Sequence, residues 1–384
     1  MMRRTILDCM TLVGTTPSRF DGEKAYVSTG AVDCDHIDYT QTESVTYGNR
    51  PSRANLSVTE GDILFAKMCG TKKTLRISKT MADHLYSTGF CAVRANEAVM
   101  IPELLYHLLA SEQFLSQKDQ NSSGATQKAI TNAGLKKITV NIPSLDEQRK
   151  LAAKLDYIED MTAKRHEQLV YLDQLVKSRF IELFGEIREV VPVSYYIKAL
   201  TAGKSLAGEE ECANKVLKTG AATYDEFDAT QFKNLPMDYT PVPEHLLKDG
   251  DIIISRMNTA ELVGATAYVW KAPQNTYLPD RLWRAELKPN ANAIFVWQML
   301  IQPSTKEQIR REASGTSGSM KNISKSGLLE LQVKKVPFEM QNQFAAFVEQ
   351  TDKSKYYSSL SFQSCQQAAS NYRQEWMTCR TLNS

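Results

Sequence analysis

The sequence predicts an α+β protein in which one unit occurs twice. Two observations carry this prediction. Two long helix-forming stretches share one hydrophobic spacing, and short motifs recur in the same order about 190 residues apart. Each unit then consists of a mixed domain followed by one long helix. We expect the two helices to pair in antiparallel fashion as an intramolecular coiled coil, which would give the two similar domains a pseudo-twofold relation.

The first long helix is predicted between Ile142 and Glu186. This stretch has no Gly before Gly185 and no Pro after Pro143, and good helix formers dominate it. Either Ser144 or Asp146 can cap its start. Apolar residues recur at alternating steps of four and three, so they form one stripe that requires a partner helix. The stripe includes Leu151, Leu155, Ile158, Leu169, Leu172 and Val176.

The C-terminal segment, 337–384, carries a matching stripe. Adding 193 to the positions of the first helix gives a second set of seam residues, although Thr351 and Lys355 make its middle more polar. We therefore expect this helix to be the partner of the first. Arg165 and Arg179 interrupt the first seam, where they either set the register of the pair or lie at its wet edge. The residues of the second seam include Phe344, Val348, Phe362, Tyr372 and Trp376.

Short motifs indicate that the two domains are copies. Val27–Ala31 matches Leu217–Ala221, and Gly61–Phe65 matches Gly250–Ile254. A Gly-Asp pair before three apolar residues is turn chemistry that delivers a buried strand. The resulting division is a first domain at 1–144, its helix at 145–186, a second domain at 187–336 and its helix at 337–384.

Within each domain the sequence predicts short strands, one helix of moderate length and a polar loop that contains Gly. The strands are expected at 25–30, 62–67 and 89–94, and again at 252–255 and 265–270. The helix is expected over Pro102–Ser116, with Pro near its first turn, and its counterpart begins at Ala293. The polar loops are Asn121–Ile130 and Ala313–Ile323.

The composition narrows the classes of protein. With 42% hydrophobic residues, 23% charged residues and a net charge of +2, the chain has an ordinary globular composition. A local basic surface could still bind nucleic acid. The seven cysteines never form CxxC, so we expect free thiols in a reducing cytoplasm and no zinc site. No stretch reaches the roughly 18 apolar residues of a membrane span, and Asp8 interrupts the first apolar run, which argues against a signal peptide.

Enzyme motifs are absent or weak. The chain has no GxxxxGK[ST] motif, and it lacks the Gly-rich cofactor loop and the Asn/Asp-Pro-Pro-aromatic motif of a DNA methyltransferase. Its histidines are isolated, so no metal site is expected. Asp280, Glu286 and Lys288 imitate the PD…ExK nuclease pattern, in which carboxylates hold Mg²⁺, but their spacing is short for it. A self-contained nuclease is one alternative reading, and a coiled-coil scaffold that binds proteins without DNA specificity is another.

The order of elements resembles the DNA specificity (S) subunit of type I restriction-modification systems. The resemblance rests on the P-S-L-D-E-Q motif at Pro143–Gln148, the paired Gly-Asp strands and the G-A-T-Q-K loop at Gly124–Lys128, and it covers essentially the whole chain. It implies two target recognition domains for double-stranded DNA, and docking of methyltransferase (M) and restriction (R) subunits. It also implies that this chain is non-catalytic and carries no cofactor, with S-adenosylmethionine, ATP and Mg²⁺ on the partner subunits.

A bipartite DNA target follows from this layout. About 38 helical residues make a rod roughly 55 Å long, which could hold two half-sites up to about 16 base pairs apart. Because the two domains differ in sequence, we expect two different half-sites and an asymmetric target.

DNA contact needs Lys and Arg for phosphates, and Arg, Asn, Gln, Ser or Thr for base edges. Any single such residue is as easily a solvated surface residue, but their occurrence at equivalent places in both repeats favours DNA contact. In the first domain the candidates are Arg50, Arg53, Lys67, Lys72, Lys73, Thr126, Gln127 and Lys128. In the second they are Arg256, Asn258, Thr259, Arg281, Arg284, Ser319, Lys321 and Asn322.

Overall fold

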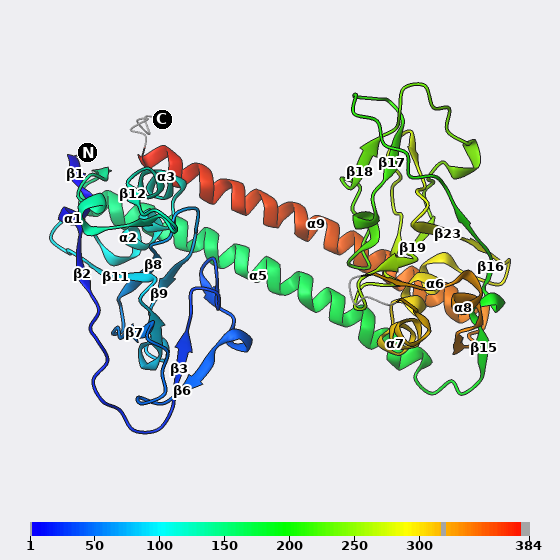
Figure 1. Ribbon diagram of the computed structural model, residues 1–384, viewed down its shortest axis with the longest axis horizontal. Helices are drawn as coiled ribbons and strands as arrows, with labels where there is room; N and C mark the ends of the chain where they lie inside the picture. The colour runs from blue at the N-terminus through cyan, green and yellow to red at the C-terminus, as the bar shows by residue number, and fades with distance from the viewer. Residues whose placement is uncertain (1, 316–319, 378–384) are drawn as a thin grey trace. The chain divides into compact units, whose positions relative to one another are not determined.

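The computed structural model describes residues 2–315 and 320–377, with the side chains of 373–377 left out of the description. The chain divides into two compact units (Figure 1). Unit 1 comprises 1–168 and 358–384, and unit 2 comprises 169–357. Each unit contains one α+β domain and one half of each long helix, so the α+β class with two similar domains and a helix pair is confirmed.

Domain 1, the part of unit 1 that precedes the first long helix, has two four-stranded sheets. The central sheet has the order β2-β11-β8-β9, all antiparallel, and the second has the order β6-β3-β10-β7 with β3 and β10 parallel. The central strands are β2 (Met10–Val13), β11 (Phe90–Ala95), β8 (Ile63–Ala66) and β9 (Thr74–Arg76). Those of the second sheet are β6 (Glu43–Val45), β3 (Lys24–Val27), β10 (Leu85–Ser87) and β7 (Ala54–Leu56).

Short strand pairs and helices complete domain 1. The pairs are β1 (Met2–Thr5) with β14 (Thr139–Ile142), β4 (Val32–Asp33) with β5 (His36–Ile37), and β12 (Ser122–Ser123) with β13 (Ala129–Ile130). The helices are α1 (Ile6–Cys9), α2 (Pro102–Leu109), α3 (Glu112–Gln120) and α4 (Asn132–Leu135).

Domain 2 lies between the long helices in sequence and repeats this plan. Its central sheet has the order β16-β23-β19-β21, and β17 and β22 form the parallel pair of a three-stranded sheet, β18-β17-β22. The strands are β16 (Ile197–Ala202), β23 (Leu282–Leu287), β19 (Ile252–Ser255), β21 (Thr266–Tyr268), β18 (Phe232–Asn234), β17 (Lys215–Leu217) and β22 (Thr276–Tyr277). Two further pairs are β15 (Val190–Pro192) with β25 (Gln332–Lys334), and β20 (Met257–Asn258) with β24 (Lys321–Asn322). The helices are α6 (Ala293–Leu300), α7 (Pro303–Glu312) and α8 (Lys325–Glu330).

The prediction of a single helix over Pro102–Ser116 is wrong, because two helices, α2 and α3, occupy this region. α2 ends at Leu109, and Ser111 caps α3 by accepting a hydrogen bond from the Phe114 amide at 3.2 Å. Ser favours a helix start over a helix interior, which explains the break. Domain 2 has the same interruption, where Pro303 begins α7.

The repeated Gly-Asp motif has one structural role in both domains. Gly61 and Gly250 both have φ +85°, a backbone conformation that glycine adopts at little cost. The following carboxylate closes the turn: Asp62 accepts from the Thr59 amide and Asp251 from the Lys248 amide, each at 2.8 Å. The motif therefore turns the chain into β8 and β19, as the sequence predicts.

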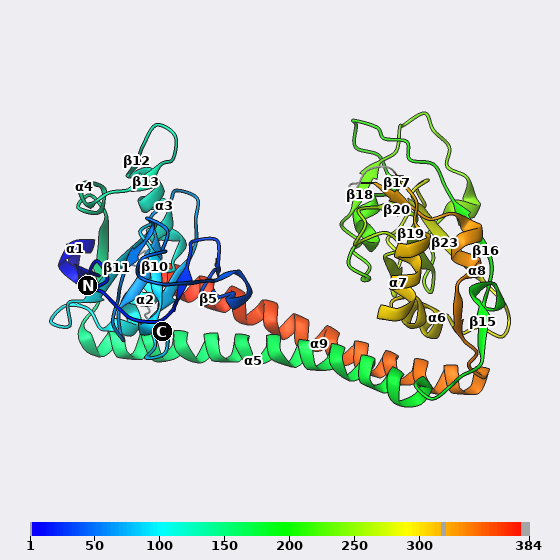
Figure 2. The same cartoon turned by 60° about the horizontal axis from the view of Figure 1, so that its bottom comes forward.

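The long helices are α5 (Leu145–Phe184) and α9 (Phe338–Met377). Of the two candidate caps for α5, Ser144 serves, since its Oγ accepts from the Glu147 amide while the Glu147 carboxylate accepts from the Ser144 amide at 3.0 Å. The Ser144 hydroxyl also donates to the Glu147 carboxylate at 2.8 Å, and this bond, together with the bond from the Ser144 amide, holds the pKa of Glu147 below its ordinary value. Each helix is continuous through both units in Figures 1 and 2.

Within each unit the two helices pack side by side in antiparallel fashion. In unit 1, Lys154 Nζ lies 5.7 Å from the Tyr372 ring centroid, and the His166 and Phe362 rings are 6.1 Å apart. In unit 2, Asp173 pairs with Lys355, and the Phe180 and Phe344 rings are 5.4 Å apart. Residue numbers therefore fall along α9 as they rise along α5.

The seam residues differ in burial. Leu151, Leu155, Val176, Phe344 and Val348 are buried. The half-buried seam residues are Ile158, Leu169, Leu172, Phe362 and Tyr372, and the side chain of Trp376 lies outside the described part of the chain. Arg165 and Arg179 are half-buried and bond to Gln168 and Glu182 of their own helix, as residues at the wet edge of a seam do.

One buried glutamine joins each long helix to its own domain. Gln148 Nε2 donates to the carbonyls of Val99 and Pro143 at 2.7 and 3.0 Å, and its Oε1 accepts from the Ile101 amide at 2.9 Å. Three buried polar groups are satisfied in this way, at the start of α5 and at the loop before α2.

Gln341 makes the same three bonds in domain 2. Its Nε2 donates to the carbonyls of Asn290 and Val336 at 3.1 and 2.8 Å, and its Oε1 accepts from the Asn292 amide at 2.9 Å. The Glu-Gln pair near the start of α5 and the Met-Gln pair near the start of α9 therefore both contain a glutamine because that glutamine makes these three hydrogen bonds.

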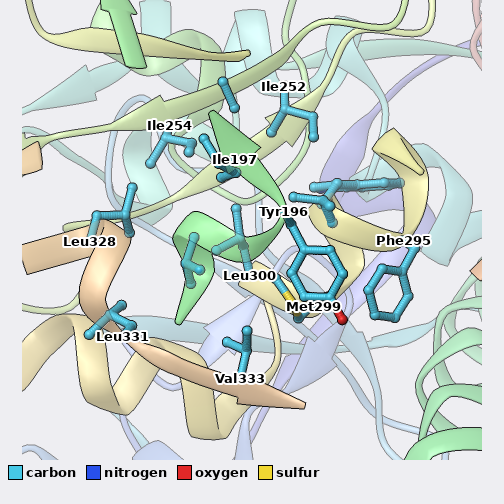
Figure 3. Packing of buried hydrophobic residues seen from close by; sticks show 14 of the residues in the cluster. Tyr196, Ile197, Ile252, Ile254, Phe295, Met299, Leu300, Leu328, Leu331 and Val333 are labelled. Carbon is cyan, nitrogen blue, oxygen red and sulfur yellow. The ribbon is translucent and has the colours of Figure 1, made fainter. Parts of the chain in front are cut away.

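The core of unit 2 is built largely from aromatic and aliphatic side chains (Figure 3). Tyr196 lies beside Phe295, and its hydroxyl donates to the Lys334 carbonyl at 2.9 Å and accepts from the Val336 amide at 2.8 Å. Burial raises the pKa of Tyr196 to about 12. This core includes Phe180, Phe184 and Phe344, so both long helices belong to it.

Candidate nucleic-acid interface

In domain 1, three backbone hydrogen bonds gather the candidate residues at one edge. The Lys67 amide donates to the Gly89 carbonyl, the Lys67 carbonyl accepts from Ile130, and the Cys69 amide donates to the Lys128 carbonyl, each at 2.9 Å. These bonds join the end of β8, the β10–β11 turn and the β12–β13 hairpin. In Figure 2 this hairpin lies on the side of the domain remote from α5.

Further candidates adjoin this edge. The Arg53 carbonyl accepts from Thr88, the residue before Gly89, at 2.9 Å, and Lys73 Nζ donates to the Thr29 carbonyl at 2.7 Å. At the hairpin tip, Thr126, Gln127 and Lys128 are exposed. The edge therefore presents cations beside uncharged polar side chains, the combination that phosphate and base contacts require.

Two candidates of domain 1 are engaged elsewhere. The Arg50 guanidinium lies 4.1 Å from the Tyr47 ring centroid and also donates to the Tyr47 carbonyl. Lys72 pairs with Glu112 at 2.6 Å. The structure does not bring these two cations to the edge formed by Lys67 and Lys128.

Domain 2 builds its edge with the same backbone bonds. The Arg256 amide donates to the Arg281 carbonyl at 3.1 Å, and the Arg256 carbonyl accepts from Ile323 at 3.0 Å. The ladder between β20 and β24 places Asn258 opposite Lys321. Thr259 follows as an exposed residue, and Ser319 lies outside the described residues. The candidates gathered in this way are Arg256, Asn258, Arg281, Lys321 and Asn322.

Arg284 does not join this edge. Its guanidinium donates to the carbonyls of Leu246 and Glu244 and lies 3.6 Å from the Asp251 carboxylate, with only 14% of the Arg284 side chain exposed. Burial raises the pKa of Asp251, against the opposing effect of its hydrogen bond from Lys248 and of Arg284. Arg284 therefore stabilises the interior of domain 2, and its expected role at the DNA surface is not supported. An Arg in a strand pattern gives no sequence signal of which way it points.

The nuclease pattern does not form a metal site. Asp280 lies two residues before β23, whereas Glu286 is near its end, and the strand from Leu282 to Glu286 alone spans about 13 Å. Each carboxylate accepts a hydrogen bond from a different hydroxyl, Asp280 from Ser205 and Glu286 from Thr201. The two carboxylates cannot share one Mg²⁺.

One charged cluster in unit 1 was missed by the sequence reasoning. His107 is fully buried, with Nε2 3.0 Å from Asp156 and Nδ1 3.3 Å from Glu159. Arg76 lies 3.2 Å from Asp156 and 4.6 Å from the Tyr106 ring centroid. These residue types can bind a metal ion, but Arg76 already pairs with Asp156, so we interpret the cluster as a charged contact between domain 1 and α5. The three-residue spacing of Asp156 and Glu159 was visible in the sequence, whereas His107 is about 50 residues away.

The chain is similar to known DNA specificity subunits of type I restriction-modification systems. A family model described as the type I restriction modification DNA specificity domain matches residues 14–170. The EcoKI specificity subunit of Escherichia coli K12 is 26% identical over 316 residues, which cover 75% of this chain and 67% of that protein. The HindI specificity subunit of Haemophilus influenzae is 25% identical over 171 residues, which cover 44% of this chain and 36% of that protein.

Solved structures share the fold. The S subunit of a type I restriction-modification system from M. genitalium matches with a TM-score of 0.59 at 14% identity, covering 99% of this chain and 96% of that one. A chain from a structural study of type I restriction-modification assembly matches with a TM-score of 0.56 at 18% identity, covering 98% and 97%. Among the residues that the structure describes, no helix combines the length and hydrophobicity needed to cross a membrane.

Proposed function

We propose that this chain is the DNA-recognition subunit of a type I restriction-modification complex, because a model of the type I DNA specificity domain matches residues 14–170 and its relatives include type I specificity subunits. The observation that carries the proposal is the shared edge. Lys67 and Lys128 in domain 1, and Arg256 and Lys321 in domain 2, are held by the same backbone hydrogen bonds. Two equivalent edges with different side chains suit one DNA target made of two different half-sites.

The mechanism follows from the chemistry of the edges. Lysines attract phosphates and make binding salt-dependent, whereas Arg, Asn and Gln can discriminate base edges in the major groove. The chain contributes recognition and not catalysis. Methyltransferase and restriction subunits would dock on it, in the cytoplasm, and would carry S-adenosylmethionine, ATP and Mg²⁺. The continuous helices α5 and α9 would set the gap between the half-sites.

The test combines two measurements on the full chain. Purified protein should bind a target duplex with an affinity that falls steeply as salt rises. Methylation of that duplex should require both this chain and a methyltransferase subunit of the same system. If partner binding persists while no duplex affinity is detectable at low salt, the chain is a protein-binding scaffold and the proposal fails.

A nuclease assay separates the remaining alternative. Incubation of the purified chain with duplex DNA and Mg²⁺ should leave the DNA intact. Cleavage that is lost in Asp280→Ala would contradict the proposal, because the DNA-recognition subunit is not expected to cut DNA by itself.

A further inference from the structure

Four equivalent positions at the two edges carry different chemistry. The shared backbone bonds align Lys67 with Arg256 and Gly89 with Arg281. Cys69 lies opposite Lys128 in domain 1 as Asn258 lies opposite Lys321 in domain 2, so Cys69 aligns with Asn258. Ala129 pairs with Met68 as Asn322 pairs with Met257, so Ala129 aligns with Asn322. At a fifth position both domains have a lysine, Lys128 and Lys321. Domain 2 thus has two arginines and two asparagines where domain 1 has Lys, Gly, Cys and Ala.

The two arginines of domain 2 stand opposite each other. The β19–β23 ladder pairs Ile254 with Trp283 and Ser255 with Leu282. One position further on, the hydrogen bond from the Arg256 amide to the Arg281 carbonyl brings Arg256 opposite Arg281. Side chains at such positions share one face, with Cβ atoms about 5 Å apart. Two like charges opposite each other repel, so this pair is favourable only when acceptors lie between or in front of the guanidinium groups.

No acceptor is supplied from within the described part of the chain. Neither arginine side chain has a hydrogen bond or ion pair to another described residue. The Nε atom of Arg256 is enclosed without a partner, and so is Nε1 of Trp283, which shares the face and is 2% exposed. Unpaired enclosed N–H groups are costly, and a ligand that lets the half-exposed Arg256 reorient onto an acceptor would remove part of that cost.

We infer that Arg256 and Arg281 read a guanine in the half-site of domain 2, an inference that rests on the function proposed above. A guanidinium group donates two parallel hydrogen bonds, which match O6 and N7 of guanine in the major groove. Lys128 and Lys321, present in both domains, act on the phosphate backbone instead, since an ammonium group is a point charge without a planar fork.

Domain 1 has no such arginine pair. A Cβ atom at Gly89 would come within 2.9 Å of Thr29 Cγ2, so the Thr29 side chain would have to shift to admit an arginine there. Lys67 keeps a charge at the other position but has no planar fork. Base reading in domain 1 then falls to other side chains, of which Thr126 and Gln127 are exposed at the hairpin tip.

The test uses the full chain and a pool of randomised duplexes, from which the wild type and each variant select their preferred sequence. Arg256→Lys and Arg281→Gly introduce the residues that domain 1 has at these positions, so neither substitution is foreign to the backbone. The wild type should select a bipartite motif with a guanine in one half. Each variant should lose discrimination at that base by about 5- to 150-fold and should keep the other half unchanged.

The possible results distinguish failure of the guanine inference from failure of the proposed function. A wild-type motif that Arg256→Lys and Arg281→Gly leave unchanged overturns the inference while the proposed function stands. Uniform weakening on every sequence, with a smaller salt slope, makes the arginines phosphate contacts and also overturns it. A wild type that selects no motif contradicts the proposed function itself, and the inference with it. Lys321→Ala is the matched control, because it should weaken binding uniformly without changing the motif.

Discussion

The two domains differ far more at the edges proposed to contact DNA than in the buried hydrogen bonds within each domain. Gln148 and Gln341 make the same three hydrogen bonds, and the Gly-Asp turns close in the same way. The equivalent edges, in contrast, carry Lys67 in one domain and Arg256 in the other. Buried polar hydrogen bonds therefore specify the fold of each domain, and side chains can change at the edge because the hydrogen bonds that hold the edge come from the backbone.

The side chains at the equivalent positions of Arg76 and Tyr268 make different contacts as well. In unit 1, His107 and Arg76 meet carboxylates of α5. In unit 2 the position of Arg76 holds Tyr268, which stacks on Trp297 at 5.8 Å between ring centroids. One backbone arrangement thus accepts a charged contact in one unit and an aromatic contact in the other.

The largest expected effect is on the aromatic core of unit 2. Phe184 is fully buried and lies 4.9 Å from Phe180 and 5.4 Å from both Phe295 and Phe344, between ring centroids. Phe184→Ala should cost about 3–5 kcal/mol. Hydrogen exchange should show lost protection in unit 2 while domain 1 keeps its own. Ile181→Ala, on the exposed face of the same helix, is the control and should change little; equal loss of protection in both domains would argue against two separate cores.

Because Gln148 and Gln341 make equivalent hydrogen bonds, replacing either should destabilise its own unit by the same amount. Gln148→Leu and Gln341→Leu each leave buried backbone groups unpaired, so each should destabilise its own unit by about 2–3 kcal/mol. Denaturant unfolding followed by hydrogen exchange measures both. Gln343→Leu, at an exposed position beside Gln341, should have almost no effect. A large loss at only one of the two buried glutamines would show that the two sets of hydrogen bonds are not equivalent.

The shared lysines predict matched effects on DNA. Lys128→Ala and Lys321→Ala should each lower affinity on all sequences, and each should reduce the slope of log affinity against log salt by about 1. Salt titrations of duplex binding provide the measurement. A changed sequence preference in either variant would assign that lysine to base reading.

The smallest expected effect separates the two helix starts. Ser144 caps α5, whereas Pro337 occupies the corresponding place before α9. Ser144→Ala should therefore cost about 1 kcal/mol at neutral pH. Because the pKa of Glu147 is lowered in the folded protein, its contribution is present above the ordinary pKa and is lost as the pH falls through the lowered value. The difference in thermal unfolding between the wild type and the variant should shrink in acid, because only the bond from Ser144 to the Glu147 carboxylate is lost there. A difference independent of pH would show that this bond contributes nothing.

The duplicated layout could be predicted from the sequence because it depends on the spacing of residue types along the chain. The 3.5-residue stripe and the Gly-Asp turns are local patterns, and both correspond to observed elements. Other features depend on long-range contacts. His107 meets α5 only after folding, Arg284 turns inward because carbonyls of the Glu244–Leu246 segment meet it there, and Arg256 faces Arg281 only through the register of β19 on β23. The type of a residue indicates what it can bind, whereas the register of the paired strands determines which residues lie beside it.

If two domains of one chain read two halves of one DNA target, methylation should mark a bipartite sequence. The measurement is to map every methylated site in a genome that expresses this chain with its methyltransferase subunits. We expect one asymmetric motif made of two different short blocks separated by a fixed number of unspecified base pairs. A contiguous motif, or a methylation pattern that does not change when the chain is removed, would contradict the account.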